Sequence, residues 1–390
     1  MTQLRRILFA TTSGAGHFGP MEPVAAACAA AGHTVAVAAP QSFAPTLARA
    51  GFTHLPFDDS PPDELGAVFA TLRRAMYEDG NRTVAREVFG RINTRSALPG
   101  MSAIVARWRP DVVVRETAEL SSYLVAEANG IPYAQVAVGL AGFDNDFLPE
   151  VVPALQILGA GDLEGLWDAP RLTIAPESVD DRLVRRHGPI LRYRDPAMTV
   201  AGAEPLPDWW AADATPASSS DPLVYVSFGT VAPGLGLYPA LYRAAVDALA
   251  GLSVRALVTI GAQSDPAAIG PLPPNVHVEP WWPQKQVMAH AAAMVGHGGF
   301  GTTMAGLAAG RPMVVLPLFA DQPHNADRVE AIGAGIALRG GPAAAAGLGE
   351  AVLRVVHERA FAEAAARVAA EMGALPPPSA AVTLIERLTG

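Results

Sequence analysis

Short apolar runs alternate with amphipathic stretches over most of the first half of the chain. Runs of strand length, bounded by glycine, proline or charged residues, lie at residues 7–10, 34–39, 111–114 and 131–138. Helix-like stretches follow the first three runs, at residues 21–31, 43–50 and 120–129. This alternation predicts βαβ units around a parallel sheet. The more polar stretch 61–101 interrupts it, and we expect a mostly helical insertion over the carboxyl edge of the sheet.

The alternation stops in a stretch rich in proline, alanine and serine and then starts again. The second series of apolar runs lies at residues 223–228, 254–260, 276–279, 293–296, 313–316 and 336–338. We therefore expect an α/β protein with two Rossmann-like, doubly wound domains, residues 1–205 and 223–375, joined by a linker at 206–222. Ligands of such sheets bind at the carboxyl ends of the strands, so the domains are expected to face each other across a cleft. Residues 376–390 contain a run of three prolines followed by a predicted helix.

A glycine-rich turn follows the first predicted strand. Residues 14–19 read Gly-Ala-Gly-His-Phe-Gly and match the spacing of NAD-binding domains. Those domains also need an acidic residue near the end of the second strand to bind the ribose. Here that strand ends Ala-Ala-Pro-Gln at residues 38–41, so an NAD-dependent oxidoreductase is only an alternative. His17 instead places an imidazole at the sheet edge, either as a general base or as a packing residue of the helix N-terminus.

A second glycine loop lies in the other half of the chain. His297, Gly298 and Gly299 follow a short predicted strand and precede a predicted helix that contains Thr302 and Thr303. Glycines let the backbone approach a ligand closely, and the free N–H groups at a helix N-terminus favour an anion. The loop is therefore a candidate cradle for a diphosphate, although a Gly-Gly pair is also common in ordinary turns.

Two pairs of residues flank this loop. Trp281 and Trp282 offer a flat face on which a nucleotide base could stack, or simply pack in the core. Asp321 and Gln322 follow the next predicted strand and could bind sugar hydroxyls, or only cap the helix that starts there. The spacing of all these pieces together favours the binding interpretation.

These motifs resemble a known family. Trp-x-Pro-Gln at 281–284, His-Gly-Gly-x-Gly-Thr-Thr at 297–303 and Asp-Gln at 321–322 are similar to the nucleotide-sugar signature of GT-B-fold family 1 glycosyltransferases. The Gly-x-Gly-His turn at 14–17 and Ser-Phe-Gly-Thr at 227–230 resemble the same family, and the resemblance covers nearly the whole chain. It is strongest to bacterial enzymes that glycosylate polyketides and other natural products. It implies two Rossmann-like domains in a GT-B fold, with the last helix packed back on the N-terminal domain.

The resemblance also implies a role for each matching residue. His17 is the implied base that deprotonates the acceptor hydroxyl in an inverting displacement, oriented by a carboxylate after strand 111–114. Glu116 is the best-placed carboxylate and Glu119 the alternative, although family members usually have aspartate there. Implied donor contacts are the stacking face of Trp281, the backbone of Trp282, the sugar-binding side chains of Asp321 and Gln322, and the diphosphate ligands Ser227, Thr230, His297, Gly298, Gly299, Thr302 and Thr303.

One departure from the family bears on the donor. Members that use UDP-glucose commonly have a glutamate two residues after the last threonine, where it binds the ribose hydroxyls, and here Ala305 stands at that position. A thymidine nucleotide has no 2′-hydroxyl to bind. We therefore expect the donor to be a dTDP-sugar whose sugar is a deoxysugar. We expect the enzyme to transfer that sugar to a hydrophobic aglycone in secondary metabolism. A UDP-glucose-dependent glucosyltransferase and a non-catalytic partner protein of the same fold are the alternatives.

The acceptor is expected in the first half of the chain. Aromatic or apolar side chains suited to a flat aglycone are Phe57, Phe69, Met76, Tyr77, Phe89 and the segment 143–147. The one Asp-x-Asp motif, at 144–146, lies far in sequence from the expected donor residues, so we expect no metal or other cofactor.

Composition narrows the range of partners and locations. The formal net charge of −9 argues against nucleic acid. Cys28 is the sole cysteine, which excludes a disulfide within the chain. No signal-peptide core or membrane-length apolar run appears, so we expect a cytoplasmic protein with no membrane span. Whether it forms a homodimer is left open.

Overall fold

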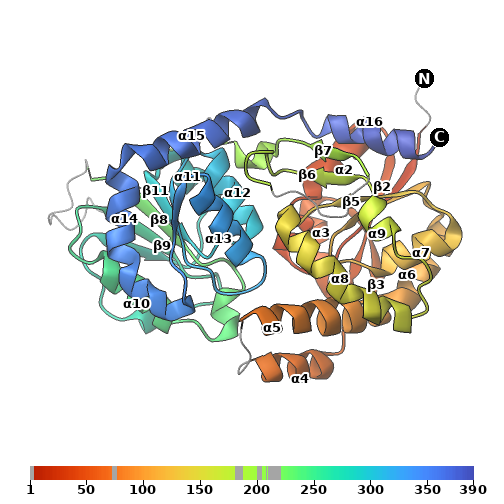
Figure 1. Cartoon of the computed structure of the whole chain (residues 1–390), viewed down its shortest axis with the longest axis horizontal. Helices are drawn as coiled ribbons and strands as arrows, with labels where there is room; N and C mark the ends of the chain where they lie inside the picture. The colour runs from red at the N-terminus through yellow and green to blue at the C-terminus, as the bar shows by residue number, and fades with distance from the viewer. Residues whose placement is uncertain (1–3, 73–76, 181–187, 200–203, 208, 210–220) are drawn as a thin grey trace. The chain divides into compact units, whose positions relative to one another are not determined.

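The computed structural model describes residues 4–72, 77–180, 188–199, 204–207, 209 and 221–390. The chain divides into two compact units (Figure 1). The first contains Met1–Ala175, Asp181–Asp195 and Leu375–Gly390, and the second contains Pro176–Asp180 and Pro196–Ala374. The change of unit between Asp195 and Pro196 precedes the expected linker, most of which lies outside the described residues.

The first unit is built on a seven-stranded parallel sheet. Its strand order is β3-β2-β1-β4-β5-β6-β7. The strands are β1 (Arg6–Ala10), β2 (Thr34–Pro40), β3 (Thr53–Phe57), β4 (Val112–Glu116), β5 (Tyr133–Val136), β6 (Arg171–Thr173) and β7 (Ile190–Arg192). Its helices are α1 (Ala15–Phe18), α2 (Glu22–Ala30), α3 (Ala44–Ala50), α4 (Pro62–Leu72), α5 (Tyr77–Thr83), α6 (Thr94–Trp108), α7 (Ser121–Asn129), α8 (Ala141–Ile157), α9 (Gly165–Asp168) and α16 (Ser379–Leu388), with short 3₁₀ turns at Gln41–Phe43 and a π-helix, η2, at Val84–Asn93.

The strands that the sequence predicts correctly are buried in the sheet. Ile7 to Ala10 are fully buried in β1, as expected of a central parallel strand with an uninterrupted apolar run. The sequence pattern missed β3 and the three-residue strands β6 and β7. Strand β3 contains Pro56 and lies at the sheet edge, where a missing backbone N–H is tolerated. The stretch 61–101 is mostly helical, as predicted.

A polar row crosses the buried sheet of the first unit. Arg115 in β4 is in register with Gln135 in β5, and Gln135 is in register with Arg171 in β6. All three are fully buried. Arg171 forms an ion pair with Asp144 of α8, with 3.0 Å between Nε and Oδ2, and Arg115 donates to Oε1 of Gln135 over 3.1 Å.

The second unit has a six-stranded parallel sheet in the order β10-β9-β8-β11-β12-β13. The strands are β8 (Leu223–Ser227), β9 (Arg255–Thr259), β10 (Val276–Glu279), β11 (Ala293–Gly296), β12 (Met313–Val315) and β13 (Gly335–Ala337). The helices are α10 (Ala240–Leu249), α11 (Gln284–His290), α12 (Phe300–Ala308), α13 (Gln322–Ala331), α14 (Leu348–His357) and α15 (Arg359–Ala374), with 3₁₀ turns at Pro196–Met198, Ala232–Leu235, Pro266–Ile269 and Gly341–Gly347. All six strands match the predicted series.

The last helix, α16, packs against α2 in the first unit. His33, which follows α2, contacts α16 through Glu386. The Arg5 backbone N–H donates to Nδ1 of His33 over 3.2 Å. The proton of the ring therefore lies on Nε2, which is 3.1 Å from Oε1 of Glu386 on α16.

Candidate active site

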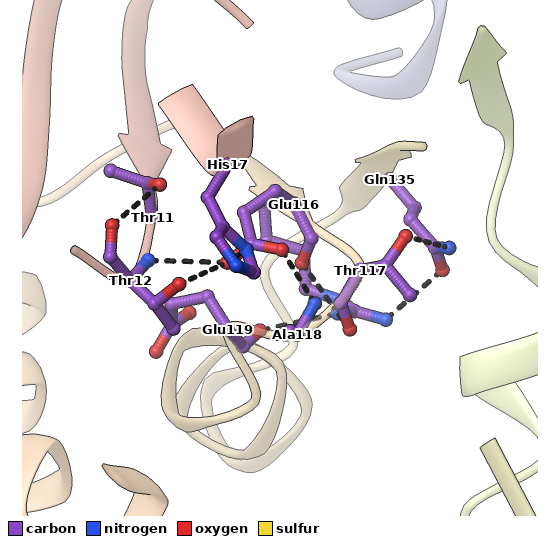
Figure 2. A network of polar contacts seen from close by, with 9 residues as sticks. Thr11, Thr12, His17, Glu116, Thr117, Ala118, Glu119 and Gln135 are labelled. Carbon is purple, nitrogen blue, oxygen red and sulfur yellow. Dashed lines mark hydrogen bonds and ion pairs between the residues drawn. The ribbon is translucent and has the colours of Figure 1, made fainter. Parts of the chain in front are cut away.

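His17 and Glu116 meet at the carboxyl edge of the first sheet. His17 lies on the short helix α1 that follows β1, and Glu116 is the last residue of the neighbouring strand β4. Nδ1 of His17 lies 3.2 Å from Oε1 of Glu116 (Figure 2). The His17 side chain is 25% exposed, whereas that of Glu116 is fully buried. The structure thus brings together the two residues that the sequence proposed as base and partner.

Hydrogen bonds around Glu116 favour its charged form. Oε1 accepts from the backbone N–H of Thr12 over 3.2 Å and from its hydroxyl over 2.9 Å, and Oε2 accepts from the N–H of Ala118 over 2.6 Å. Burial alone would raise the pKa of Glu116, but the nearby His17 and these donors outweigh burial and lower that pKa below its ordinary value. An ionised Glu116 favours the His17 tautomer with the proton on Nδ1, which leaves Nε2 able to accept one.

Glu119, the alternative partner, has a different role. Its carboxylate is buried and accepts hydrogen bonds from the hydroxyl and N–H of Ser121 and from the N–H of Ser122, at the start of α7. Burial, with the nearby charge of Glu116, raises the pKa of Glu119 despite these hydrogen bonds. The two carboxyl groups therefore have pKa values shifted in opposite directions, and only Glu116 lies against the imidazole.

The ring of Phe89 also lies against His17. Its ring centroid is 5.6 Å from that of His17, and it continues edge-to-face to Phe147, which stacks on Phe143. Phe89 belongs to the π-helix η2, a rare type of element that occurs frequently at functional sites. The other expected acceptor residues are elsewhere: Phe57 is buried in the sheet core, Phe69 is exposed on α4, and Met76 and the Tyr77 side chain lie outside the described residues.

In the second unit, His297 is enclosed by glycines. A Cβ atom at Gly229 or at Gly299 would lie 2.6 Å from Nε2 of His297, so neither position has room for a side chain. Burial lowers the pKa of His297 to about 4, and a hydrogen bond with the backbone of Ser227 opposes this only in part. The ring is therefore neutral at pH 7 and can donate one N–H without carrying a charge.

The hydroxyl residues of the expected diphosphate site differ in exposure. Ser227 and Thr302 are half-buried and Thr230 is exposed. Thr303 is only 2% exposed, on the side of α12 that faces the core. Thr303 thus differs from the other three in burial, and its contact with a diphosphate stays a prediction.

The two tryptophans have distinct environments. Trp281 is 60% exposed. The Nε1–H of Trp282 donates to Oε1 of Gln286 over 3.0 Å, and its ring packs edge-to-face on Trp209, with 4.8 Å between centroids. Trp281 therefore keeps a face on which a base could stack, whereas the side chain of Trp282 is engaged in packing.

Asp321 and Gln322 make internal hydrogen bonds. Oδ2 of Asp321 accepts from the N–H of Phe300 over 3.0 Å. Oε1 of the buried Gln322 accepts from the N–H groups of Leu318 and Phe319, over 2.8 and 2.9 Å. These hydrogen bonds hold the loops beside the two side chains, and the contacts of Asp321 and Gln322 with a donor sugar stay a prediction.

Within the described residues, no group of three or more His, Cys, Asp or Glu side chains is placed to hold a metal ion. Asp144 of the Asp-x-Asp motif is instead paired with Arg171 in the buried row. Among the helices that the structure describes, none is both long and apolar enough to cross a membrane.

Comparison with known proteins shows the family of this chain. Residues 243–388 match the family described as erythromycin biosynthesis protein CIII-like, C-terminal domain, and residues 26–154 match the corresponding N-terminal domain. The chain is 31% identical over 352 residues to the L-demethylnoviosyl transferase of Streptomyces niveus, across 85% of each chain. The chain belongs to the bacterial natural-product glycosyltransferases of family 1.

Solved structures of glycosyltransferases agree. SnogD from Streptomyces nogalater matches with a TM-score of 0.71 at 29% identity, covering 98% of this chain and 99% of that one. SsfS6 from Streptomyces sp. SF2575, complexed with thymidine diphosphate, matches with a TM-score of 0.74 at 26% identity and the same coverage. The predicted GT-B fold and sugar-transfer activity are confirmed, and the oxidoreductase alternative is wrong.

Two residues of this glycosyltransferase escaped the sequence analysis. Arg115 is fully buried, and its Nη1 donates to the carbonyls of Glu116, Thr117 and Glu119 over 2.9 to 3.1 Å, which fixes the loop that carries both carboxylates. A charged residue directly after the apolar run 111–114 was its available signal. Asn325 on α13 contacts the glycine loop, and its spacing of four residues from Asp321 was the corresponding signal.

Proposed function

We propose that this glycosyltransferase transfers a deoxysugar from a dTDP-sugar to a hydroxyl group of a hydrophobic natural-product acceptor, with inversion at the anomeric carbon. The observation that carries the proposal is the 3.2 Å contact between Nδ1 of His17 and Oε1 of Glu116. A buried carboxylate in that position stabilises the imidazolium that forms when Nε2 accepts a proton. General-base catalysis of this kind contributes about 10²–10⁴-fold to a rate.

In the proposed step, Nε2 of His17 accepts the proton of the acceptor hydroxyl as its oxygen attacks the anomeric carbon. The bond from that carbon to the diphosphate oxygen breaks as the new C–O bond forms, and the nucleoside diphosphate leaves with the electron pair. Attack from the opposite face gives inversion. Donors already aimed at the diphosphate lower the barrier as charge develops there. We assign this role to Ser227, Thr230, Thr302 and the loop from His297 to Gly299.

A thymidine nucleotide is favoured by two observations. Ala305 offers no carboxylate to a ribose 2′-hydroxyl, so a uridine nucleotide would gain nothing from its extra group. SsfS6, a structural relative at 26% identity, is complexed with thymidine diphosphate. We place the base on the exposed face of Trp281 and the sugar near Asp321 and Gln322.

The acceptor is proposed to lie on the aromatic surface beside the base. Phe89 and Phe143 are half-buried side chains of one aromatic cluster with Phe147, and the ring of Phe89 contacts His17. A flat, apolar ring system stacks favourably on such side chains. An aglycone bound there would bring a ring hydroxyl to the imidazole.

We further propose that no metal ion takes part. Neutral and backbone donors on the leaving diphosphate replace the positive charge that a metal would supply. Treatment with EDTA is expected to leave the transfer rate unchanged. Loss of activity in EDTA, with recovery on addition of Mg²⁺, would contradict this.

The test of the donor uses the full chain and two probes, dTDP and UDP, measured by titration calorimetry. We expect dTDP to bind at least about tenfold more tightly, a difference of about 1.4 kcal/mol. Transfer from dTDP-deoxysugars to a panel of hydroxylated aromatic acceptors should then yield a product whose anomeric configuration, read by NMR, is opposite to that of the donor. Tighter UDP binding together with transfer from UDP-glucose would favour the glucosyltransferase alternative instead.

A further inference from the structure

The first turns of α13 hold both ends of the glycine loop. Nδ2 of Asn325 donates to the carbonyl of Gly298 over 2.7 Å and to Oδ2 of Asp321 over 2.6 Å. The same oxygen of Asp321 accepts from the N–H of Phe300 over 3.0 Å. Asp321 and Asn325 are four residues apart and so lie on one face of the helix. Asn325 is fully buried. One amide and one carboxylate therefore bind the loop immediately before and after Gly299.

The loop needs these hydrogen bonds because the glycine residues in it do not restrict the backbone dihedral angles. Gly298 has a φ of +88°, and a Cβ there would lie 2.7 Å from Val315 and 3.0 Å from the carbonyl of Gln322. Only glycine fits this position, and glycine has more backbone freedom than any other residue. An anion site works best when its N–H groups are already oriented before the ligand arrives.

The hydrogen bond to Gly298 sets the direction of one of those N–H groups. In a trans peptide the carbonyl and the following N–H point in opposite directions. Holding the carbonyl of Gly298 toward Asn325 therefore turns the N–H of Gly299 away from α13. If this peptide flipped, a carbonyl oxygen would face the anion and repel it.

We propose that Asn325 is a positioning residue that fixes the Gly298–Gly299 peptide in the orientation that binds the diphosphate of the donor. The inference rests on the proposed function of the loop. Asn325 acts through the backbone and through Asp321, without itself contacting the nucleotide. Its amide can serve two acceptors at once because both of its hydrogens are used, which no alanine or aspartate could do.

The chain offers a matched control in Asn275. It is also a buried asparagine of the second unit, and its Nδ2 donates to the carbonyls of Leu249, Leu252 and Val254 over 2.9, 3.3 and 3.0 Å. These bonds tie the residue before β10 to the end of α10 and to the turn before β9, and they do not touch the glycine loop. Replacing Asn275 therefore removes the same chemistry without altering the proposed site.

The experiment compares Asn325→Ala and Asn275→Ala in the full chain, with dTDP as the probe in calorimetry and thermal unfolding as the measure of stability. We expect both variants to unfold at lower temperature. Only Asn325→Ala should raise the Kd for dTDP, by about tenfold, as loss of one buried hydrogen bond predicts. If Asn325→Ala does not fold, Asn325→Ser, whose hydroxyl can donate to one of the two acceptors, takes its place.

The outcomes separate the inference from the proposed function. An Asn325 variant that binds dTDP as the wild type does would overturn the role of Asn325 alone. Equal losses of affinity in the Asn325 and Asn275 variants would also overturn it, because the effect would then follow general destabilisation. A wild-type chain that binds neither dTDP nor UDP would overturn both the proposed function of the loop and this inference.

Discussion

Nδ1 of His17 lies 3.2 Å from a carboxylate oxygen of Glu116, although 99 residues separate them in the chain. The contact exists because β1 and β4 are neighbours in the sheet and both end at the same edge. Glu116 carries a lowered pKa there, while Glu119, three residues later, has a raised one. Carboxyl groups with opposite shifts in one site usually have different tasks.

Replacement of His17 by alanine should reduce kcat by about 10²–10⁴-fold, because the acceptor hydroxyl loses its base. The Kd for dTDP should stay unchanged, since the residues proposed to bind the diphosphate belong to the second unit. Steady-state kinetics with calorimetry measures both.

Glu116→Gln should also lower kcat, because His17 loses the carboxylate beside it, and Glu119→Gln should leave kcat close to wild type while lowering the stability of the fold. If the Glu119 variant were the slower one, the two carboxylates would have to exchange roles.

Phe89→Leu should raise the KM for a flat acceptor by several-fold while the Kd for dTDP is retained. The change removes an aromatic ring that contacts His17, and aromatic pairs contribute about 0.5–1.5 kcal/mol beyond their buried area. Phe69→Leu is the control, because Phe69 is exposed on α4. Equal effects of both variants on KM would show that the acceptor does not use the surface beside the base.

Trp281→Ala should weaken dTDP binding by about 1–3 kcal/mol, the usual contribution of one base stacked on an aromatic side chain. Trp282→Phe should instead lower the unfolding temperature, because it removes the hydrogen bond to Gln286. Calorimetry and thermal unfolding of the two variants give the comparison. A larger loss of affinity in Trp282→Phe than in Trp281→Ala would assign the stacking face to Trp282.

Acid should destabilise the second unit through His297. Its pKa is about 4 in the folded chain, below the value of 6.5 for an unperturbed histidine. The unfolded chain therefore binds a proton first, and the free energy of unfolding falls as the pH drops from 6.5 to about 4, by about 3 kcal/mol in total. Above pH 6.5 this contribution is fully present. Urea unfolding at several pH values measures the fall.

The control for this prediction is a histidine in an open environment. His297→Gln should flatten the decline between pH 6.5 and 4, whereas His357→Gln, at an exposed position on α14, should leave it unchanged. An identical decline in both variants would mean that other groups cause the acid sensitivity.

The sequence predicted the central strands because a parallel strand buried on both faces must be apolar throughout, as Ile7 to Ala10 are. It ranked Glu116 above Glu119 but kept Glu119 as the alternative, since the two lie within a few residues of each other after the run 111–114. The structure separates them, because Glu116 lies against His17 whereas the first N–H groups of α7 bind Glu119. The sequence also suggested Thr303 as a ligand. Its burial on the core side of α12 could not be predicted, because a motif does not give the rotation of a helix about its axis.

The polar row of Arg115, Gln135 and Arg171 has a consequence for assembly of the first sheet. A strand that slipped by one position would turn its side chains to the opposite face. A guanidinium would then enter an apolar layer without its acceptors, at a cost of several kcal/mol. The row therefore favours one register for the three adjacent strands β4, β5 and β6. The register of β4 in turn determines the position of Glu116 beside His17.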